Sequence, residues 1–267
     1  MPHLSELQRD YRDKNVTIIG LTSEDRTNTL EKVKAMVEDK GDTMGFTVAW
    51  DTERKTNEAY MKAANQRGIP TSFLVDQKGN VAWIGHPAMV DIPLAQVVAG
   101  EWDYEKGPAL MKQINEEKRE IYTAAKENPK EALALLMAFQ EQYPAASKGM
   151  ESLHFGFLSQ LPDKVAEAEK IGDKIVDKAI AKEDPGALNQ FAWGLVDPEV
   201  DKPNRFLDLA LRAANAANEF THEKDGAILD TVARVHFWKG DLDRALSIQK
   251  KAVEHAKGEM KEQLKAA

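Results

Sequence analysis

The chain has 267 residues, with 44 acidic against 36 basic side chains and a formal net charge of -8 at pH 7. This length predicts about two domains, and the acidic balance argues against nucleic acid or an anionic membrane as a partner. No run approaches the roughly 18 apolar residues that a membrane-spanning helix requires. The sequence contains no cysteine, so it can supply neither a thiolate nucleophile, nor a disulfide, nor a cysteine-bound metal site.

The first fifty residues alternate between helical and strand patterns. An amphipathic helix is predicted at the start, because one helical face carries Leu4, Leu7 and Tyr11. The run Val16–Leu21 is continuously apolar, which is typical of a strand buried on both faces of a parallel sheet. Asn28-Thr29-Leu30-Glu31 has capping-box spacing and predicts a helix up to Gly41. A further strand is predicted over Phe46–Trp50.

The stretch 66–85 combines a helix stop, a proline and a hairpin. Gly68 is predicted to end a helix whose apolar face includes Tyr60, and Ile69-Pro70 leads into the next segment. Two short strands, Thr71–Val75 and Val81–Ile84, are separated by a turn. A short closing helix follows. Strands that alternate with helices and end in a hairpin indicate an α/β layer with a mixed sheet.

This order of elements, with Gly-Ile-Pro-Thr-Ser-Phe-Leu-Val-Asp at its centre, resembles the thioredoxin-like domain of TlpA/ResA-type thiol-disulfide oxidoreductases. The resemblance covers about residues 1–102. It implies a cis bond between Ile69 and Pro70 and a substrate groove formed by Ile69, Pro70 and Thr71, whose backbone pairs with an extended thiol or disulfide partner, a protein or peptide. The alternative is a trans proline that merely begins an edge strand.

The resemblance also implies that the domain is incomplete. In that family a Met-Pro-x-Leu run like Met1–Leu4 follows the CxxC motif, and the strand before the CxxC is central. That strand lies between those matching Val16–Leu21 and Thr71–Val75. The expected fold is therefore an α/β thioredoxin-like domain without its central strand, prone to aggregate or to unfold in part. If the missing start is like the family's, the protein is exported or anchored on the outer face of a membrane.

From about Asp103 the strand signals end, and an all-α domain is predicted over residues 103–267. Asn128-Pro129 begins a helix, with a capping residue and a proline at the first helical position. Residues 187–257 contain a repeat that resembles tetratricopeptide helix pairs, whose period is about 34 residues. In this repeat Leu188, Phe191, Ala192 and Leu195 match Leu229, Val232, Ala233 and His236, and Ala210 and Ala217 match Ala245 and Ala252. Such pairs imply a protein ligand for the helical domain.

Other chemistry-bearing residues favour structural explanations. None of the histidines, which include His86, lies at metal-ligand spacing, and His236 is predicted to be a hydrogen-bonded core residue. No metal or cofactor site is predicted. Loop polarity accounts for Ser23, Glu24 and Asp25, which follow the first strand without a Ser-His-Asp order. The aromatic residues of the repeat are predicted to pack between helices, namely Trp193, Phe237 and Trp238.

Two hypotheses follow. In the first, the chain belongs to a thiol-disulfide oxidoreductase whose true start lies upstream, so that the chain as written is inactive in redox chemistry. In the second, it is a redox-dead thioredoxin-like domain whose helical repeats hold a partner. An in-frame W-C-x-x-C encoded upstream of Met1 favours the first, and a stop codon directly upstream favours the second.

Overall fold

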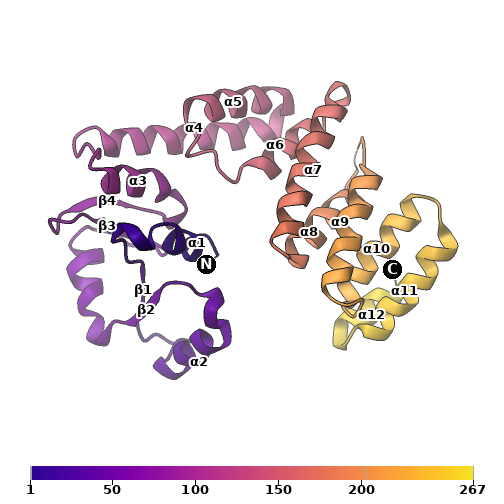
Figure 1. Ribbon diagram of the computed structural model, residues 1–267, viewed down its shortest axis with the longest axis horizontal. Helices are drawn as coiled ribbons and strands as arrows, with labels where there is room; N and C mark the ends of the chain where they lie inside the picture. The colour runs from indigo at the N-terminus through magenta and orange to yellow at the C-terminus, as the bar shows by residue number, and fades with distance from the viewer. Residues whose placement is uncertain (1, 202, 267) are drawn as a thin grey trace. The chain divides into compact units, whose positions relative to one another are not determined.

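The computed structural model describes residues 2–201 and 203–266. Met1, which opens the Met1–Leu4 run, and Ala267, the predicted end of the helical domain, lie outside the described residues. The chain divides into two units, Met1–Glu116 and Glu117–Ala267. Figure 1 shows that the strands of the described residues lie in the first unit, whereas the described part of the second unit consists of helices and their connections. The division falls inside helix α4, and the boundary at 102/103 remains a prediction.

The first unit alternates helices and strands, as the sequence pattern predicts. Its main elements are α1 (Pro2–Asp10), β1 (Ile19–Thr22), α2 (Leu30–Lys40), β2 (Thr47–Trp50), β3 (Ser72–Val75), β4 (Val81–Gly85), α3 (Asp91–Ala99) and the start of α4 (Gly107–Glu127). Short helical segments lie between several of these elements. One of them, Asn57–Lys62, precedes β3.

The four strands form two separate pairs and not one sheet. Strands β1 and β2 are parallel, with Ile19 opposite Thr47, and β3 and β4 are antiparallel, with Ser72 opposite Gly85. No strand among the described residues joins β1 to β3. The mixed sheet indicated by the pattern is therefore present only as these two pairs, whose outer edges meet no described strand. That a central strand is missing between them remains a prediction.

Strand β1 is shorter and more exposed than its apolar sequence predicts. The Gln8 carboxamide donates to the Val16 carbonyl at 2.9 Å and accepts from the Ile18 N–H at 2.6 Å, so these backbone groups are engaged by a side chain before the ladder begins. Ile19 and Leu21 remain 58% and 46% exposed. The prediction of burial on both faces is wrong for these two residues, because burial of that kind requires helices or loops packed on both faces of the sheet, and the face that carries Ile19 and Leu21 is not fully covered.

Two helix boundaries differ from the sequence prediction. Helix α2 is capped by Thr29, whose hydroxyl accepts from the Lys32 N–H, and not by Asn28. The Asn28 side chain instead donates to the Thr22 hydroxyl. The helical segment Asn57–Lys62 ends well before Gly68, and Asn65 adopts the left-handed conformation with φ of 52°. Asparagine tolerates this conformation, so the chain can leave the helix there without glycine.

The core of the first unit lies around the hairpin and α3. Trp83 on β4 and Leu94 and Val97 on α3 are buried. Beyond α3, the Tyr104 hydroxyl donates to the Asp76 carboxylate in the β3–β4 turn. This bond fastens the chain that follows α3 to the turn of the hairpin.

The second unit is built from helices joined by short connections. Its elements after α4 are α5 (Pro129–Gln142), α6 (Glu151–Leu158), α7 (Val165–Ala181), α8 (Pro185–Val196), α9 (Leu207–Phe220), α10 (Gly226–Trp238), α11 (Leu242–His255) and α12 (Gly258–Ala266). The predicted start at Asn128 is confirmed, since its side chain accepts from the N–H groups of Lys130 and Glu131. Helix pairs α8–α9 and α10–α11 bury the small residues that the repeat aligned, Ala210, Ala217, Ala245 and Ala252.

The aromatic residues at the end of α10 only partly occupy the core. Phe237 is half exposed, so its predicted packing between helices is wrong. Trp238 donates its indole N–H to the Val196 carbonyl at 2.8 Å, and the Arg205 guanidinium lies 3.9 Å from its ring centroid. These contacts hold the long connection between α8 and α9 against the end of α10. His236 is buried as predicted, but its Nδ1 lies 3.6 Å from the nearest Asp241 oxygen, too far for a good hydrogen bond.

Candidate functional site

The segment Ile69-Pro70-Thr71 stands at the entry to β3. The Ile69–Pro70 peptide bond is cis. Ile69 is 89% exposed, an unusual environment for a large aliphatic side chain, and the Thr71 hydroxyl donates to the Gly68 carbonyl at 2.6 Å. This hydrogen bond spans three residues and closes the Gly68–Thr71 turn. An apolar side chain and its flanking backbone are therefore presented to solvent at the start of a strand.

Strand β3 offers backbone groups next to this segment. One edge of β3 pairs with β4, and no described strand occupies the other. The ring of Phe73 on β3 meets the ring of Tyr60 edge to face at 5.2 Å, which packs the segment Asn57–Lys62 against the strand. The segment before Pro70 is thus held from one side, while the open edge of β3 remains available to an extended chain.

Strand β1, like β3, also has one edge that no described strand occupies. The Thr47 N–H donates to Ile18 and the Asp51 N–H donates to Thr22, so the even-numbered residues of this strand face β2. Because successive residues direct their backbone groups to opposite sides, those of Ile19 and Leu21 face away from β2. In the described part of the chain no strand meets them. The first unit therefore combines open strand edges on β1 and β3 with exposed apolar side chains.

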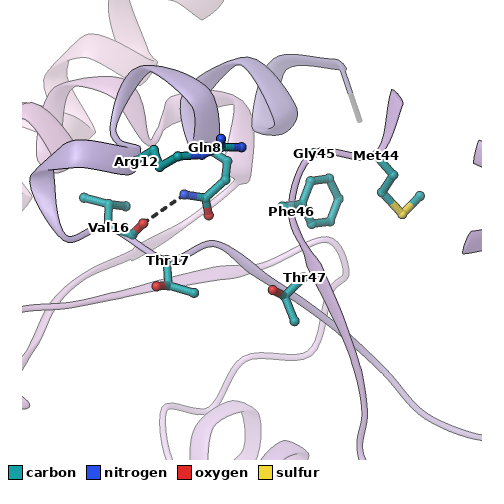
Figure 2. A pocket seen from close by; sticks show the side chains of 8 residues that line it. All are labelled: Gln8, Arg12, Val16, Thr17, Met44, Gly45, Phe46 and Thr47. Carbon is teal, nitrogen blue, oxygen red and sulfur yellow. Dashed lines mark hydrogen bonds between the residues drawn. The ribbon is translucent and has the colours of Figure 1, made fainter. Parts of the chain in front are cut away.

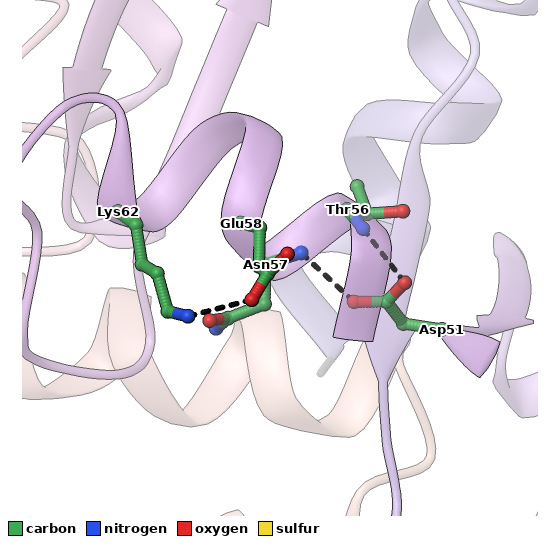
Figure 3. Close-up of polar contacts among 5 residues, drawn as sticks. All are labelled: Asp51, Thr56, Asn57, Glu58 and Lys62. Atoms are coloured by element: carbon green, nitrogen blue, oxygen red, sulfur yellow. Dashed lines mark hydrogen bonds and ion pairs between the residues drawn. The ribbon is translucent and has the colours of Figure 1, made fainter. Parts of the chain in front are cut away.

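Asp51, at the carboxyl end of β2, organises the turn that follows this strand. Figure 3 shows its carboxylate accepting from the N–H groups of Thr56 and Asn57, both at 2.8 Å. Burial raises the pKa of Asp51, but these two hydrogen bonds outweigh it, so the pKa lies below its usual value. Sequence reasoning missed this residue. Its signal was an Asp at a strand end, five and six residues before the backbone groups of a helical segment.

A hollow of about 480 Å³ lies at the opposite end of the parallel pair (Figure 2). It is lined by Gln8, Arg12, Val16, Thr17, Met44, Gly45, Phe46 and Thr47. Ligand sites of α/β proteins occur beyond the carboxyl ends of the strands, whereas this hollow adjoins their amino ends. The Gln8 side chain within it is occupied by backbone contacts. The hollow is therefore better explained by the local packing of α1 than as a catalytic site.

Two further polar residues singled out in the sequence, Asp25 and His86, have local hydrogen-bond partners. Asp25 accepts from the N–H groups of Thr27 and Asn28, which lowers its pKa. His86 accepts from the Ala88 N–H at 3.2 Å. No group of three or more potential metal ligands is found among residues 2–201 and 203–266. In the same ranges, no helix is both long and apolar enough to cross a membrane.

Comparison with known families agrees with the arrangement of the first unit. Residues 1–84 match the AhpC/TSA family, a redoxin family with the thioredoxin-like fold. The N-terminal region is therefore a member of the redoxin, thioredoxin-like class. Among characterised proteins, the chain is similar to protein FixW of Rhizobium leguminosarum, with 27% identity over 107 residues, covering 37% of this chain and 47% of that protein.

The chain spans about half the length of this relative. No solved structure matches the chain. The redoxin match includes the Ile69–Thr71 segment but ends before α3, and it brings no cysteine, since the sequence has none. The thioredoxin-like match therefore covers residues 1–84, while thiol-disulfide chemistry requires thiolates that this sequence does not contain.

Proposed function

We propose that residues 1–102 form the substrate-binding part of a TlpA-type thiol-disulfide oxidoreductase. In this proposal the two cysteines and the central strand come from a segment that precedes residue 1 in the complete protein. The observation that carries the proposal is the pair of open edges on β1 and β3, which leaves the sheet in two halves within a region of redoxin sequence. A strand inserted between them would join the two pairs into one mixed sheet.

The chemistry of the complete protein would be dithiol-disulfide exchange. One thiolate attacks a substrate disulfide and releases a substrate thiolate, and the second thiolate then resolves the mixed disulfide. One dithiol is oxidised while one disulfide is reduced, so no further oxidant is needed. The role of this chain would be binding: Ile69, Pro70 and Thr71 would line the groove, and the exposed Ile69 backbone would pair with an extended protein or peptide substrate.

The assignment of α8–α11 as tetratricopeptide-like pairs is part of the same proposal. It is supported by matched Ala positions that are buried in both pairs, at offsets of 35 residues between Ala210 and Ala245 and between Ala217 and Ala252. Their role would be to hold a protein partner near the redox unit. In this reading the complete protein is exported, or anchored on the outer face of a membrane.

A redox-dead binding module is the second candidate function. It is favoured by the absence of cysteine from the whole chain. The thioredoxin-like unit would then bind extended peptides without reacting with them. The two candidates share the same groove residues and differ only in whether cysteines precede them.

A chimera tests the redox proposal directly. The chain alone should not catalyse the dithiothreitol-dependent reduction of insulin, because it has no thiolate. A strand-CxxC-helix segment from a TlpA-type redoxin, fused before Met1, should confer that activity, and the same fusion with both cysteines changed to serine should not. A folded chimera without activity would contradict the proposed position of the sheet.

The choice between the two candidates depends on the upstream codons. An in-frame W-C-x-x-C preceded by an apolar strand and an export signal would support the oxidoreductase. A stop codon directly upstream of Met1 would support the binding module, and peptide binding would then be measured with the chain as it stands.

A further inference from the structure

The outer side of α11 carries an apolar strip with nothing packed on it in the described residues. Leu242 and Leu246 are 59% and 58% exposed, and they lie one helical turn apart on the same side. The side of α11 that faces α10 is marked by the buried Ala245 and Ala252. The two leucines therefore do not contribute to the α10–α11 core.

Helix α12 covers only the C-terminal half of α11. The Gln249 carboxamide donates to the Leu264 carbonyl at 3.0 Å and to the Asp230 carboxylate at 2.7 Å, and Leu264 packs in a cluster with Ala252. Within residues 203–266 no comparable cover reaches Leu242 and Leu246. The N-terminal half of α11 therefore exposes these two leucines next to its charged side chains.

Two exposed charges of opposite sign flank the leucine strip. Asp243 and Lys250 are seven residues apart, which places them on the same side of the helix two turns from each other. Neither forms an ion pair among the described residues, although several other charged side chains of this unit are paired. The strip therefore offers one negative and one positive charge, in a fixed order along the helix.

We propose that this strip binds a second copy of the same chain, with the two α11 helices crossing in antiparallel orientation at Leu246. Around the twofold axis of such a pair, Asp243 of each copy faces Lys250 of the other, so the favourable contact occurs twice. In a parallel pair the Asp243–Lys250 contacts would not form, because twofold symmetry along the helix axes places this flank of the two copies on opposite sides of the interface. The surface is thus complementary to itself only in the antiparallel orientation.

The self-complementary charge order favours a second copy over an unrelated partner. Two leucines and one helix face make a small contact, well below the area that stable dimers bury, so the pair should be weak and dependent on concentration. The prediction is independent of the redoxin unit. It requires only the α10–α11 helix pair and its exposed side.

Charge reversal in the full chain tests the proposal by sedimentation velocity over a roughly hundredfold range of concentration. The wild type should shift from monomer to dimer. Leu246→Glu should remain monomeric, and Asp243→Lys or Lys250→Asp alone should each weaken association roughly tenfold. An equimolar mixture of these two single variants should associate at least as tightly as the wild type, because one copy then presents two cations and the other two anions.

Lys251→Asp, on the same helix but away from the strip, is the matched control and should leave association unchanged. Circular dichroism should show the same helical signal for all variants, since every changed side chain is exposed. A wild type that is monomeric at every concentration, or association that persists in Leu246→Glu, would overturn the proposal. So would a mixture that associates no better than its two components.

Discussion

The two units differ in how their backbones are satisfied. In the second unit each helix makes its own backbone hydrogen bonds, and its core side chains are fully enclosed, as in Leu188, Ala192 and Val196 with 0% exposure. In the first unit each strand depends on a neighbour, and β1 presents Ile19 and Leu21 to solvent along an open edge. An array of helices can end after any pair, whereas a sheet that lacks a strand leaves backbone groups without partners.

The comparison shows that an apolar run in the sequence predicts burial more reliably in the second unit than in the first. Apolar helix faces in the second unit meet their neighbours along the chain, so their burial follows from local order. The apolar run of β1 requires strands and helices from distant parts of a sheet. Where these are lacking, the same kind of residue lies exposed and becomes an association hazard.

Expressing the units separately should show the largest effect. Residues 103–267 should melt cooperatively when followed by circular dichroism, since their contacts lie between neighbouring helices. Residues 1–102 should be aggregation-prone or unfold without cooperativity, because buried backbone groups left unsatisfied cost about 1–3 kcal/mol each. Adding an upstream strand and helix turn should restore solubility and a cooperative urea transition. A short form that is monomeric and equally cooperative would show that the open edges are tolerated.

A matched pair of leucine substitutions sharpens the comparison within the intact chain. Leu188→Ala should destabilise the helical unit by about 2–5 kcal/mol, because it leaves a cavity in a fully enclosed site. Leu21→Ala should destabilise the first unit by only about 1 kcal/mol, since this side chain is 46% exposed. Urea unfolding of both variants measures the difference. Similar losses would mean that β1 is covered in solution.

The Tyr104–Asp76 contact should give the first unit an acid-dependent stability. Hydrogen bonds, the largest contribution coming from the Tyr104 hydroxyl and smaller ones from Asn80 and the Lys78 N–H, outweigh desolvation and lower the Asp76 pKa from 3.8 to about 2. Because the folded pKa is depressed, the contribution is full above the unfolded pKa and is lost as pH falls from about 4 towards 2. Tyr104→Phe should raise the Asp76 pKa and reduce this loss. Carboxyl titration by NMR measures the shift, and Tyr122→Phe, in the second unit, should leave it unchanged.

The smallest effect is expected at a surface ion pair of the helical unit. Arg212 on α9 pairs with Asp173 and Asp177 on α7, and its Nη1 lies 2.9 Å from the Asp173 carboxylate. The side chains are partly exposed, so Arg212→Gln should cost about 0.2–1 kcal/mol. Thermal melts at low and high salt should show the difference shrinking as salt rises. A larger loss that is insensitive to salt would indicate a packing role for Arg212.

Several parts of the fold could be predicted from local sequence. The hairpin around residues 72–85 follows from two short apolar strands and a turn, and the start of α5 follows from Asn128 and Pro129. The buried faces of α8 and α10 follow from their 3.6-residue periodicity, which Leu188 and Leu229 illustrate. The segment Ile69–Thr71 was singled out through its resemblance to the redoxin family. Its functional role remains a prediction.

Other features depended on which segments meet in space. Local pattern could not show that Gln8 engages the backbone before β1, that Asp51 holds the turn after β2, or that Thr29 replaces Asn28 as the cap of α2. Each depends on a competition among nearby donors and acceptors that the folded chain resolves.

The amino-acid sequence by itself determined the redoxin class of the first unit, the helical nature of the second and the lack of any thiolate. Only the tertiary structure decided that the strands form two pairs with open edges, that Ile19 and Leu21 are exposed, and that Phe237 lies partly outside the core. The reason is physical: helix formation is governed by contacts within a few residues. The pairing of strands and the covering of their faces depend on segments far apart in the chain. A local sequence pattern cannot predict which of these segments come into contact.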